Sequence, residues 1–320
     1  MEVLERIGLT GLIPVVVIKD PADAVPAAKA ILKSGIDVIE ITMRTEAGLD
    51  SISRIREEVP EILVGAGTVL TIENLKAASS AGAQFVVTPG YNRHIVEWCI
   101  ENNMPITPGC VTPTEIGTAI GQGLKVLKFF PADIYGGINA CKSLYGPFGH
   151  TGLKFIPTGG INEKNLKEYA DKQYIHAIGG GWLCSTEDLA AKNYDNITTT
   201  CERAIDILLG FEFAHMGINT SGESNAEELG TYFDKAFGLR TKKGNSSDFA
   251  GGEIELVKGK GLGENGHIAI RTNHIDRAMN YLEKKGYRIA KETIKLKNGL
   301  TTAVYLQDNV AGFAVHLLQK

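Results

Sequence analysis

Short apolar runs alternate with amphipathic stretches over the first 210 residues. Residues 12–18 are almost continuously apolar, as in a strand that is buried on both faces. A stretch with helical spacing follows from Asp20-Pro21 and ends at Ser34-Gly35. The same alternation predicts strands over 12–18, 37–44, 62–68, 84–88, 104–108, 124–130, 153–158 and 174–178. The later helices are expected over 46–58, 72–81, 92–102, 113–121, 137–145, 162–171 and 186–209.

Eight β/α units within about 210 residues predict a compact (β/α)8 TIM barrel with parallel, right-handed connections. A doubly wound open sheet is the alternative α/β fold. It would be expected to carry a glycine-rich dinucleotide turn after the first strand, and Lys19-Asp-Pro is no such turn.

The pattern changes after residue 210. A strand over 211–218, a helix over 224–237 and a strand over 252–257 are followed by the same order of elements. The second set comprises a strand over 266–270, a helix over 275–285 and strands near 287–293, 301–306 and 312–318. This weak internal repeat predicts a smaller α+β domain of paired βαβββ modules. We therefore expect two domains, 1–210 and 211–320.

Composition narrows the classes of function. The chain has 320 residues, of which 43% are apolar and 22% charged, and its net charge is −4, so no basic surface for nucleic acid is expected. No apolar run approaches the length of a membrane span, and the N-terminus lacks the pattern of a signal peptide. The five cysteines are scattered, which favours reduced thiols. We expect a cytoplasmic protein that binds neither nucleic acid nor membrane.

One lysine of the sixth predicted strand carries candidate chemistry. Strand alternation puts Lys128 on one side with Val126 and Phe130, and Lys125 on the other. Pro131 ends the strand, so Lys128 lies near its C-terminal end, among apolar side chains. Desolvation disfavours an ammonium there, and a neutral amine can attack a carbonyl to form a Schiff base. The alternative is a lysine whose amine remains in water.

Glu40 interrupts an apolar strand, which is costly unless the carboxylate is paired or functional. It could form a buried salt bridge with Arg44 or Lys128, or act as an acid/base group beside the amine. Arg44 follows at the same parity, and its guanidinium could bind a substrate carboxylate together with Thr68. Thr68 could equally hydrogen-bond to a neighbouring strand.

Two glycine-rich loops follow the seventh and eighth predicted strands, Thr158-Gly159-Gly160 and Gly179-Gly180-Gly181. Barrel enzymes commonly bind phosphate at this position, through backbone amides. The alternative is a pair of tight strand–helix turns.

These motifs resemble those of the bacterial class I aldolases that cleave 2-dehydro-3-deoxy-6-phosphogluconate (KDPG) and 4-hydroxy-2-oxoglutarate (KHG). The resemblance covers the whole predicted barrel. It rests on six segments in order: 38–45, 64–69, 88–90, 128–132, 146–148 and 157–161. It implies a carbon–carbon lyase that needs no metal or cofactor, takes a small 2-oxo acid and forms a homotrimer.

The resemblance also implies residue roles. Lys128 would be the Schiff-base lysine and Glu40 the general acid/base. The other implied substrate-binding residues are Arg44, Thr68, Pro89, Phe130, Thr158, Gly159, Gly160, Gly180 and Gly181. The products would be pyruvate and either glyceraldehyde 3-phosphate or glyoxylate. Gly181 departs from the family, which often has a phosphate-binding serine there, so substrate preference stays open.

Residues 211–320 resemble glyoxalase, or vicinal-oxygen-chelate, modules. The resemblance implies four candidate ligands for a divalent metal, namely His215, Glu255, His267 and His316. The alternative is a domain that serves only binding or assembly. Two other functions stay open: a degenerate barrel that binds or senses a metabolite, and a second, metal-dependent activity on a related 2-oxo acid or aldehyde.

Overall fold

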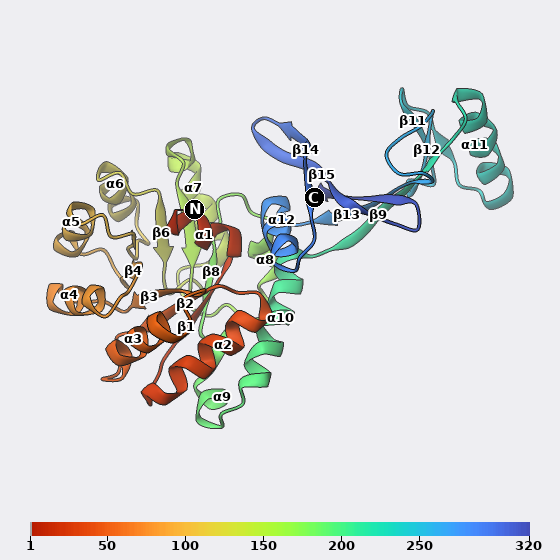
Figure 1. The fold of residues 1–320 in the computed structure, drawn as a ribbon. Coiled ribbons are helices and arrows are strands. Elements are labelled where there is room, and N and C mark those ends of the chain that lie inside the picture. Colours follow the sequence, from red (N-terminus) through yellow and green to blue (C-terminus); the bar gives the residue numbers. More distant parts are fainter. Residues whose placement is uncertain (1) are drawn as a thin grey trace. The chain divides into compact units, whose positions relative to one another are not determined.

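The computed structural model describes residues 2–320 and divides the chain into two compact units, Met1–Leu208 and Leu209–Lys320. Figure 1 shows helices outside a curled sheet in the first unit and a mainly β-stranded second unit. None of the described helices is long and apolar enough to cross a membrane.

The first unit alternates strands and helices. Its strands are β1 (Leu12–Val16), β2 (Val38–Thr42), β3 (Leu63–Gly67), β4 (Val86–Val87), β5 (Ile106–Thr107), β6 (Val126–Phe129), β7 (Lys154–Pro157) and β8 (Ile178–Gly180). The helices are α1 (Val3–Thr10), α2 (Ala24–Ser34), α3 (Gly48–Glu58), α4 (Ile72–Ser80), α5 (Arg93–Glu101), α6 (Pro113–Gly121), α7 (Gly137–Phe148), α8 (Lys167–Ala170), α9 (Thr186–Ala190) and α10 (Tyr194–Leu209). Three short 3-10 helices complete it: η1 (Pro21–Asp23), η2 (Gly149–Thr151) and η3 (Gly181–Cys184).

The strands of this unit pair in parallel. One sheet has the order β5-β4-β3-β2-β1-β8, and β6 pairs with β7. Single parallel bridges join Gly109 to Lys128 and Thr158 to Gly179, so the β6-β7 pair connects to β5 on one side and to β8 on the other. The first unit is thus an α/β domain with a curled parallel sheet of the TIM-barrel type.

The interior is filled from the N-terminal ends of the strands. Ile13, Val38, Leu63 and Phe85 lie in one buried cluster, and α1 contributes Ile7 to it. Burying such side chains stabilises the fold by about 1.5–3 kcal/mol each. Because α1 and these side chains occupy that end of the sheet, the C-terminal ends of the strands remain for a functional site.

Local sequence explains where several helices begin and end. Thr112 caps α6 in a capping box with Glu115, and Pro113 is its first residue. Gly35 ends α2 with φ 106°, a conformation that favours glycine. The helix α1 was not among the expected elements.

The second unit contains a mixed sheet with two helices. Its strands are β9 (Glu212–Asn219), β10 (Thr241–Lys242), β11 (Ser247–Ala250), β12 (Ile254–Val257), β13 (Gly266–Thr272), β14 (Ile289–Lys297), β15 (Leu300–Val310) and β16 (Phe313–Gln319). The helices are α11 (Glu223–Phe237) and α12 (Ile275–Lys284). The strand order is β10-β11-β12-β9-β13-β16-β15-β14.

The sheet order shows the internal repeat directly. Each half runs strand, helix and then three strands, and the halves meet where β9 and β13 pair antiparallel. Each of these two strands pairs in parallel with the last strand of its own half, β12 or β16. Four strands that carry chemically interesting side chains therefore lie side by side at the centre.

Three expectations need correction. The last strand of the first unit covers Ile178–Gly180, later than the expected 174–178. Strands β10 and β11 were missed because the segment 241–250 is short and largely polar. The strand β2 ends at Thr42, so Arg44 lies in an exposed turn and strand alternation does not orient it towards Glu40.

Candidate functional site

Two buried charged side chains meet inside the first unit. Lys128 on β6 is 5% exposed and Glu40 on β2 is 2% exposed. The distance from Lys128 Nζ to Glu40 Oε1 is 3.6 Å, and the amine also lies 5.1 Å from the centre of the Phe130 ring. The alternative of a Lys128 amine that remains in water is therefore wrong, and Glu40, the acid/base group considered for this amine, lies beside it.

Gly67 on β3 makes the room that Glu40 occupies. Thr42 pairs with Gly67 and Glu40 with Gly65, so both glycines lie beside β2. A Cβ atom on Gly67 would lie 2.0 Å from Glu40 Oε1, which is not a possible contact. The carboxylate can occupy its position only because residue 67 has no side chain.

We expect Gly67→Ala to lower kcat/KM of a reaction that uses Lys128 and Glu40 by about ten- to a hundredfold. Displacing a reacting group by about 1 Å lowers the rate by a factor of that order. The nearest atoms in the way all belong to the Glu40 side chain, so we expect the carboxylate to move and the fold to stay intact. Steady-state kinetics and thermal unfolding measure the two effects. Gly117→Ala on α6 is the control, because a Cβ there meets nothing within 4 Å. An unchanged kcat/KM in Gly67→Ala would show that the position of Glu40 does not matter.

The other expected residues of this site surround it less closely. Thr68 is half-buried, directly after β3, with φ 56°, an uncommon conformation for threonine. Pro89 and Phe130 are half-buried after β4 and β6. Arg44 is exposed, and no ion pair joins it to Glu40 in residues 2–320. The salt bridge considered between Glu40 and Arg44 is therefore absent from the described residues.

The two glycine-rich loops lie side by side, as predicted from the strand order. Thr158 bridges to Gly179, and a Cβ on Gly179 would lie 2.3 Å from the Thr158 hydroxyl. The Ala132 amide, after β6, donates a hydrogen bond of 2.8 Å to the Thr158 carbonyl. Gly159 and Gly160 have φ of 95° and 71°, which favours glycine at both positions. The loops after β6, β7 and β8 thus form one edge of the first unit.

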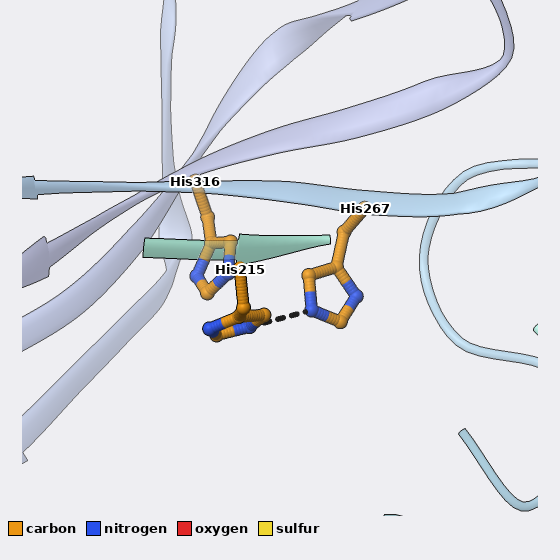
Figure 2. A group of neighbouring side chains, drawn as sticks. All are labelled: His215, His267 and His316. Carbon is orange, nitrogen blue, oxygen red and sulfur yellow. Dashed lines mark hydrogen bonds between the residues drawn. The ribbon is translucent and has the colours of Figure 1, made fainter. Parts of the chain in front are cut away.

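A second cluster lies in the second unit. His215 on β9, His267 on β13 and His316 on β16 point towards one another, and Figure 2 shows the three rings converging. The His215 and His267 Nε2 atoms are 3.0 Å apart, and each lies 3.0 Å from Oε2 of Glu255 on β12. All four candidate ligands expected from the sequence are therefore brought together.

Strand register explains this convergence. Glu255 pairs with Gly217, and Gly217 with His267, in one row across β12, β9 and β13. Ala269 pairs with both His215 and His316, which makes the adjacent row. Residues directly opposite on neighbouring strands face the same way. A Cβ on Gly217 would lie 2.1 Å from the His267 ring, so glycine makes room for this imidazole.

The protons of the two imidazoles are too few to make a hydrogen bond between every pair of contacting atoms in this cluster. Three atoms that are each 3.0 Å from the other two need a proton along every edge, but each neutral imidazole has one proton in total. At least one edge is then left with two acceptors or two donors facing each other. His316 lies beside them, and neither of its ring nitrogens has a hydrogen-bond partner within residues 2–320. A shared cation would satisfy all of these groups.

Charge states agree with that interpretation. Burial raises the pKa of Glu255, but hydrogen bonds from His215, His267 and Ser247 outweigh it, and the pKa lies well below its ordinary value. Burial, followed by the nearby His267 and His215, lowers the pKa of His316 to about 3. At neutral pH the cluster thus has a carboxylate and an uncharged imidazole, the forms that bind metals.

Comparison with known proteins concerns the first unit. The family model "KDPG and KHG aldolase" matches residues 3–200. The 2-dehydro-3-deoxy-phosphogluconate aldolase of Treponema pallidum is 41% identical over 207 residues, which cover 65% of this chain and 96% of that protein. The KHG/KDPG aldolase of Escherichia coli K12 is also 41% identical, over 203 residues that cover 63% of this chain and 94% of that protein.

Solved structures agree. The KDPG aldolase of Legionella pneumophila, with pyruvate captured as a covalent carbinolamine, has a TM-score of 0.60 and 35% identity. That match covers 62% of this chain and 97% of the other. The fold, the buried lysine–glutamate pair and these relatives define the protein as a class I aldolase, a carbon–carbon lyase. The chain belongs to the KDPG and KHG aldolase family.

Two residues important for these sites were not singled out from the sequence. Gly67 and Gly217 have no reactive group, and their role is to leave space for Glu40 and His267. The sequence did contain an indication for Gly67, because this residue lies in segment 64–69, one of the segments that resemble the aldolase family. Nothing in the local sequence marked Gly217, because its neighbour His267 lies 50 residues further along the chain.

Proposed function

We propose that the first unit cleaves KDPG, KHG or both, with Lys128 as the Schiff-base lysine and Glu40 as the general acid/base. The observation that carries this assignment is the 3.6 Å separation of two buried groups, one a nucleophile and the other able to transfer protons. We further propose that residues 1–210 form a closed (β/α)8 barrel, and the bridges on both sides of the β6-β7 pair support this.

The reaction begins when the unprotonated Lys128 amine attacks the C2 ketone. Glu40 protonates the carbonyl oxygen, which forms a carbinolamine, and then helps the hydroxyl group leave as water. The resulting iminium draws electrons from the C3–C4 bond. As Glu40, acting through a water molecule, accepts the C4 hydroxyl proton, this bond breaks and the aldehyde product is released. The enamine left on Lys128 takes a proton at C3, and hydrolysis of the iminium returns pyruvate and the free amine.

Substrate orientation comes from residues at the C-terminal ends of the strands. Arg44 and Thr68 would bind the carboxylate next to the ketone, and the exposed turn of Arg44 leaves its guanidinium able to reach a ligand. Pro89 and Phe130 would form the wall of the pocket. Thr158, Gly159, Gly160, Gly180 and Gly181 would hold the far end of the substrate. Side-by-side assays of pyruvate release from KDPG and KHG test the proposal, and absence of release from both would refute it.

Substrate preference should respond to Gly181. A Cβ at this position meets only the Val15 carbonyl oxygen, at 3.7 Å, so a serine fits without rearrangement. We expect Gly181→Ser to raise kcat/KM for KDPG by about tenfold, since a hydrogen bond to a charged group contributes about 1.5–3 kcal/mol. The value for KHG should stay unchanged. Gly181→Ala separates the hydroxyl from the added carbon, and an equal gain in both variants would contradict a phosphate contact.

We also propose that the second unit is a glyoxalase-like domain, covering 211–320, with a divalent metal site formed by His215, Glu255, His267 and His316. This proposal is supported by the three mutually close atoms His215 Nε2, His267 Nε2 and Glu255 Oε2, whose hydrogen bonds cannot all be satisfied. His215, His267 and Glu255 would hold such a cation together, because their nitrogen and oxygen atoms lie 3.0 Å from one another. When bound, such a metal supplies a Lewis acid that polarises a ligand oxygen. Metal analysis of protein purified without a histidine tag tests it.

The homotrimer expected from the resemblance stays a prediction. Sedimentation of the full chain tests it, and a monomer at all concentrations would contradict it.

A further inference from the structure

The row of paired residues that contains Glu255 and His267 continues to the edge of the sheet. Glu255 pairs with Phe249 on β11, and Phe249 pairs with Lys242 on β10. Lys242, Phe249, Glu255, Gly217 and His267 thus form one line across five strands. Since directly opposite residues face the same side of a sheet, Lys242 lies on the face that carries the histidines.

A cavity of about 610 Å3 opens on this side. Its lining residues are Arg240, Lys242, Lys243, Gly244, Asn245, Ser246, Ser247, Phe249 and Gly252. One wall of the cavity contacts the metal-site candidates. The Phe249 ring meets His215 edge to face, with centroids 5.6 Å apart, and Phe249 pairs with Glu255 on the neighbouring strand. The cavity therefore lies on one side of Phe249, and the cluster lies against the same residue.

The charge of this cavity has one sign. Three of the described residues that line it are cationic, and none is acidic. Lys243 is paired with Glu227. Arg240 and Lys242 are exposed, and no carboxylate within residues 2–320 forms an ion pair with either. Two cations without anionic partners thus line a space that borders a cluster with its own carboxylate.

We propose that this cavity binds the oxyanion of a small molecule, a carboxylate or a phosphate ester, through Arg240 and Lys242, while an oxygen elsewhere in the same molecule reaches the histidine cluster. The inference builds on the proposed metal site and adds the class of substrate. Neighbouring strands are about 4.8 Å apart, so the Cα atoms of Lys242 and Glu255 lie about 10 Å from each other. That span suits a short chain with an anionic end rather than a bare ion bound at both places.

Local hydrogen exchange of the full-length protein tests the inference. Inorganic phosphate and pyruvate are the two probes, compared with chloride at equal ionic strength, and the measured segment is 240–252. We expect one or both probes to slow amide exchange there. Arg240→Ala/Lys242→Ala should weaken this effect at least about tenfold, since two charge-assisted contacts are lost. Lys235→Ala/Lys297→Ala removes the same charge at exposed positions outside the cavity and should keep the effect.

The same samples report on the metal separately. Relaxation of the phosphate 31P or pyruvate carboxyl 13C nucleus by protein-bound Mn2+ shows whether the anion lies beside the cluster. Protection of segment 240–252 by phosphate alone would assign a phosphate ester, and protection by pyruvate alone a carboxylate. The anion site is refuted, and the metal site stands, if Mn2+ binds but neither probe slows exchange in segment 240–252. The same conclusion follows if the probes slow exchange equally in the wild type and in Arg240→Ala/Lys242→Ala. If Mn2+ fails to bind while protection depends on Arg240 and Lys242, the anion site stands and the metal site is refuted.

Discussion

Lys128→Ala is expected to lower kcat/KM for pyruvate release by at least about a thousandfold, because no other group can form the iminium that accepts electrons from the C3–C4 bond. The lysine is 5% exposed and lies 3.6 Å from Glu40 Oε1, which places its amine beside the acid/base group that the reaction uses. Borohydride added with pyruvate should trap one covalent adduct on Lys128 in the wild type and none in the variant. Mass spectrometry of the digested protein identifies the site.

Lys125→Ala is the matched control. It removes a lysine three residues earlier, one that is exposed just before β6. Turnover and trapping should both remain. A borohydride adduct on another lysine, or turnover that survives in Lys128→Ala, would contradict Lys128 as the nucleophile. The description of the fold would not be affected. Because the reaction uses an iminium rather than a metal, EDTA should not change the rate of pyruvate release.

His267→Gln is expected to weaken metal binding by at least about a hundredfold. Loss of a ligand costs at least as much as loss of the groups that orient one, which is about ten- to a hundredfold. His267 lies 3.0 Å from both His215 and Glu255, so its loss removes two of the three contacts between these atoms. Titration calorimetry with Zn2+, Ni2+ and Mn2+ measures the affinity, and elemental analysis measures the occupancy.

His94→Gln removes an exposed imidazole of α5, far from this cluster in the sequence, and should bind metal as the wild type does. A wild-type protein that retains less than about a tenth of an equivalent after incubation with each ion would rule out the site. Pyruvate release should be unchanged in His267→Gln, because the proposed aldolase residues all lie before residue 182. A parallel loss of both properties would indicate a folding defect instead.

The patterning of apolar positions was enough to predict most elements of both units. Parallel strands that alternate with helices place residues at strand ends on one edge, so the meeting of Lys128 with Glu40, and of Thr158 with Gly179, followed from order and parity. The expectation for Arg44 was wrong because parity holds only inside a strand, and β2 ends at Thr42. In the second unit, β10 and β11 have too few apolar residues to be predicted as strands. The sequence therefore did not indicate that Lys242 and Phe249 lie near the histidine cluster.

What the sequence determined by itself was local and periodic: which segments are strands or helices, and which reactive side chains lie at their ends. Tertiary structure alone decided how far apart those side chains are, because register between strands depends on pairing across long stretches of chain. It placed three donor atoms 3.0 Å from one another, aligned Lys242 with His267 across five strands, and required glycine at 67 and 217. A residue without a side chain shows no pattern of its own, and its role appears only when its neighbours are in place.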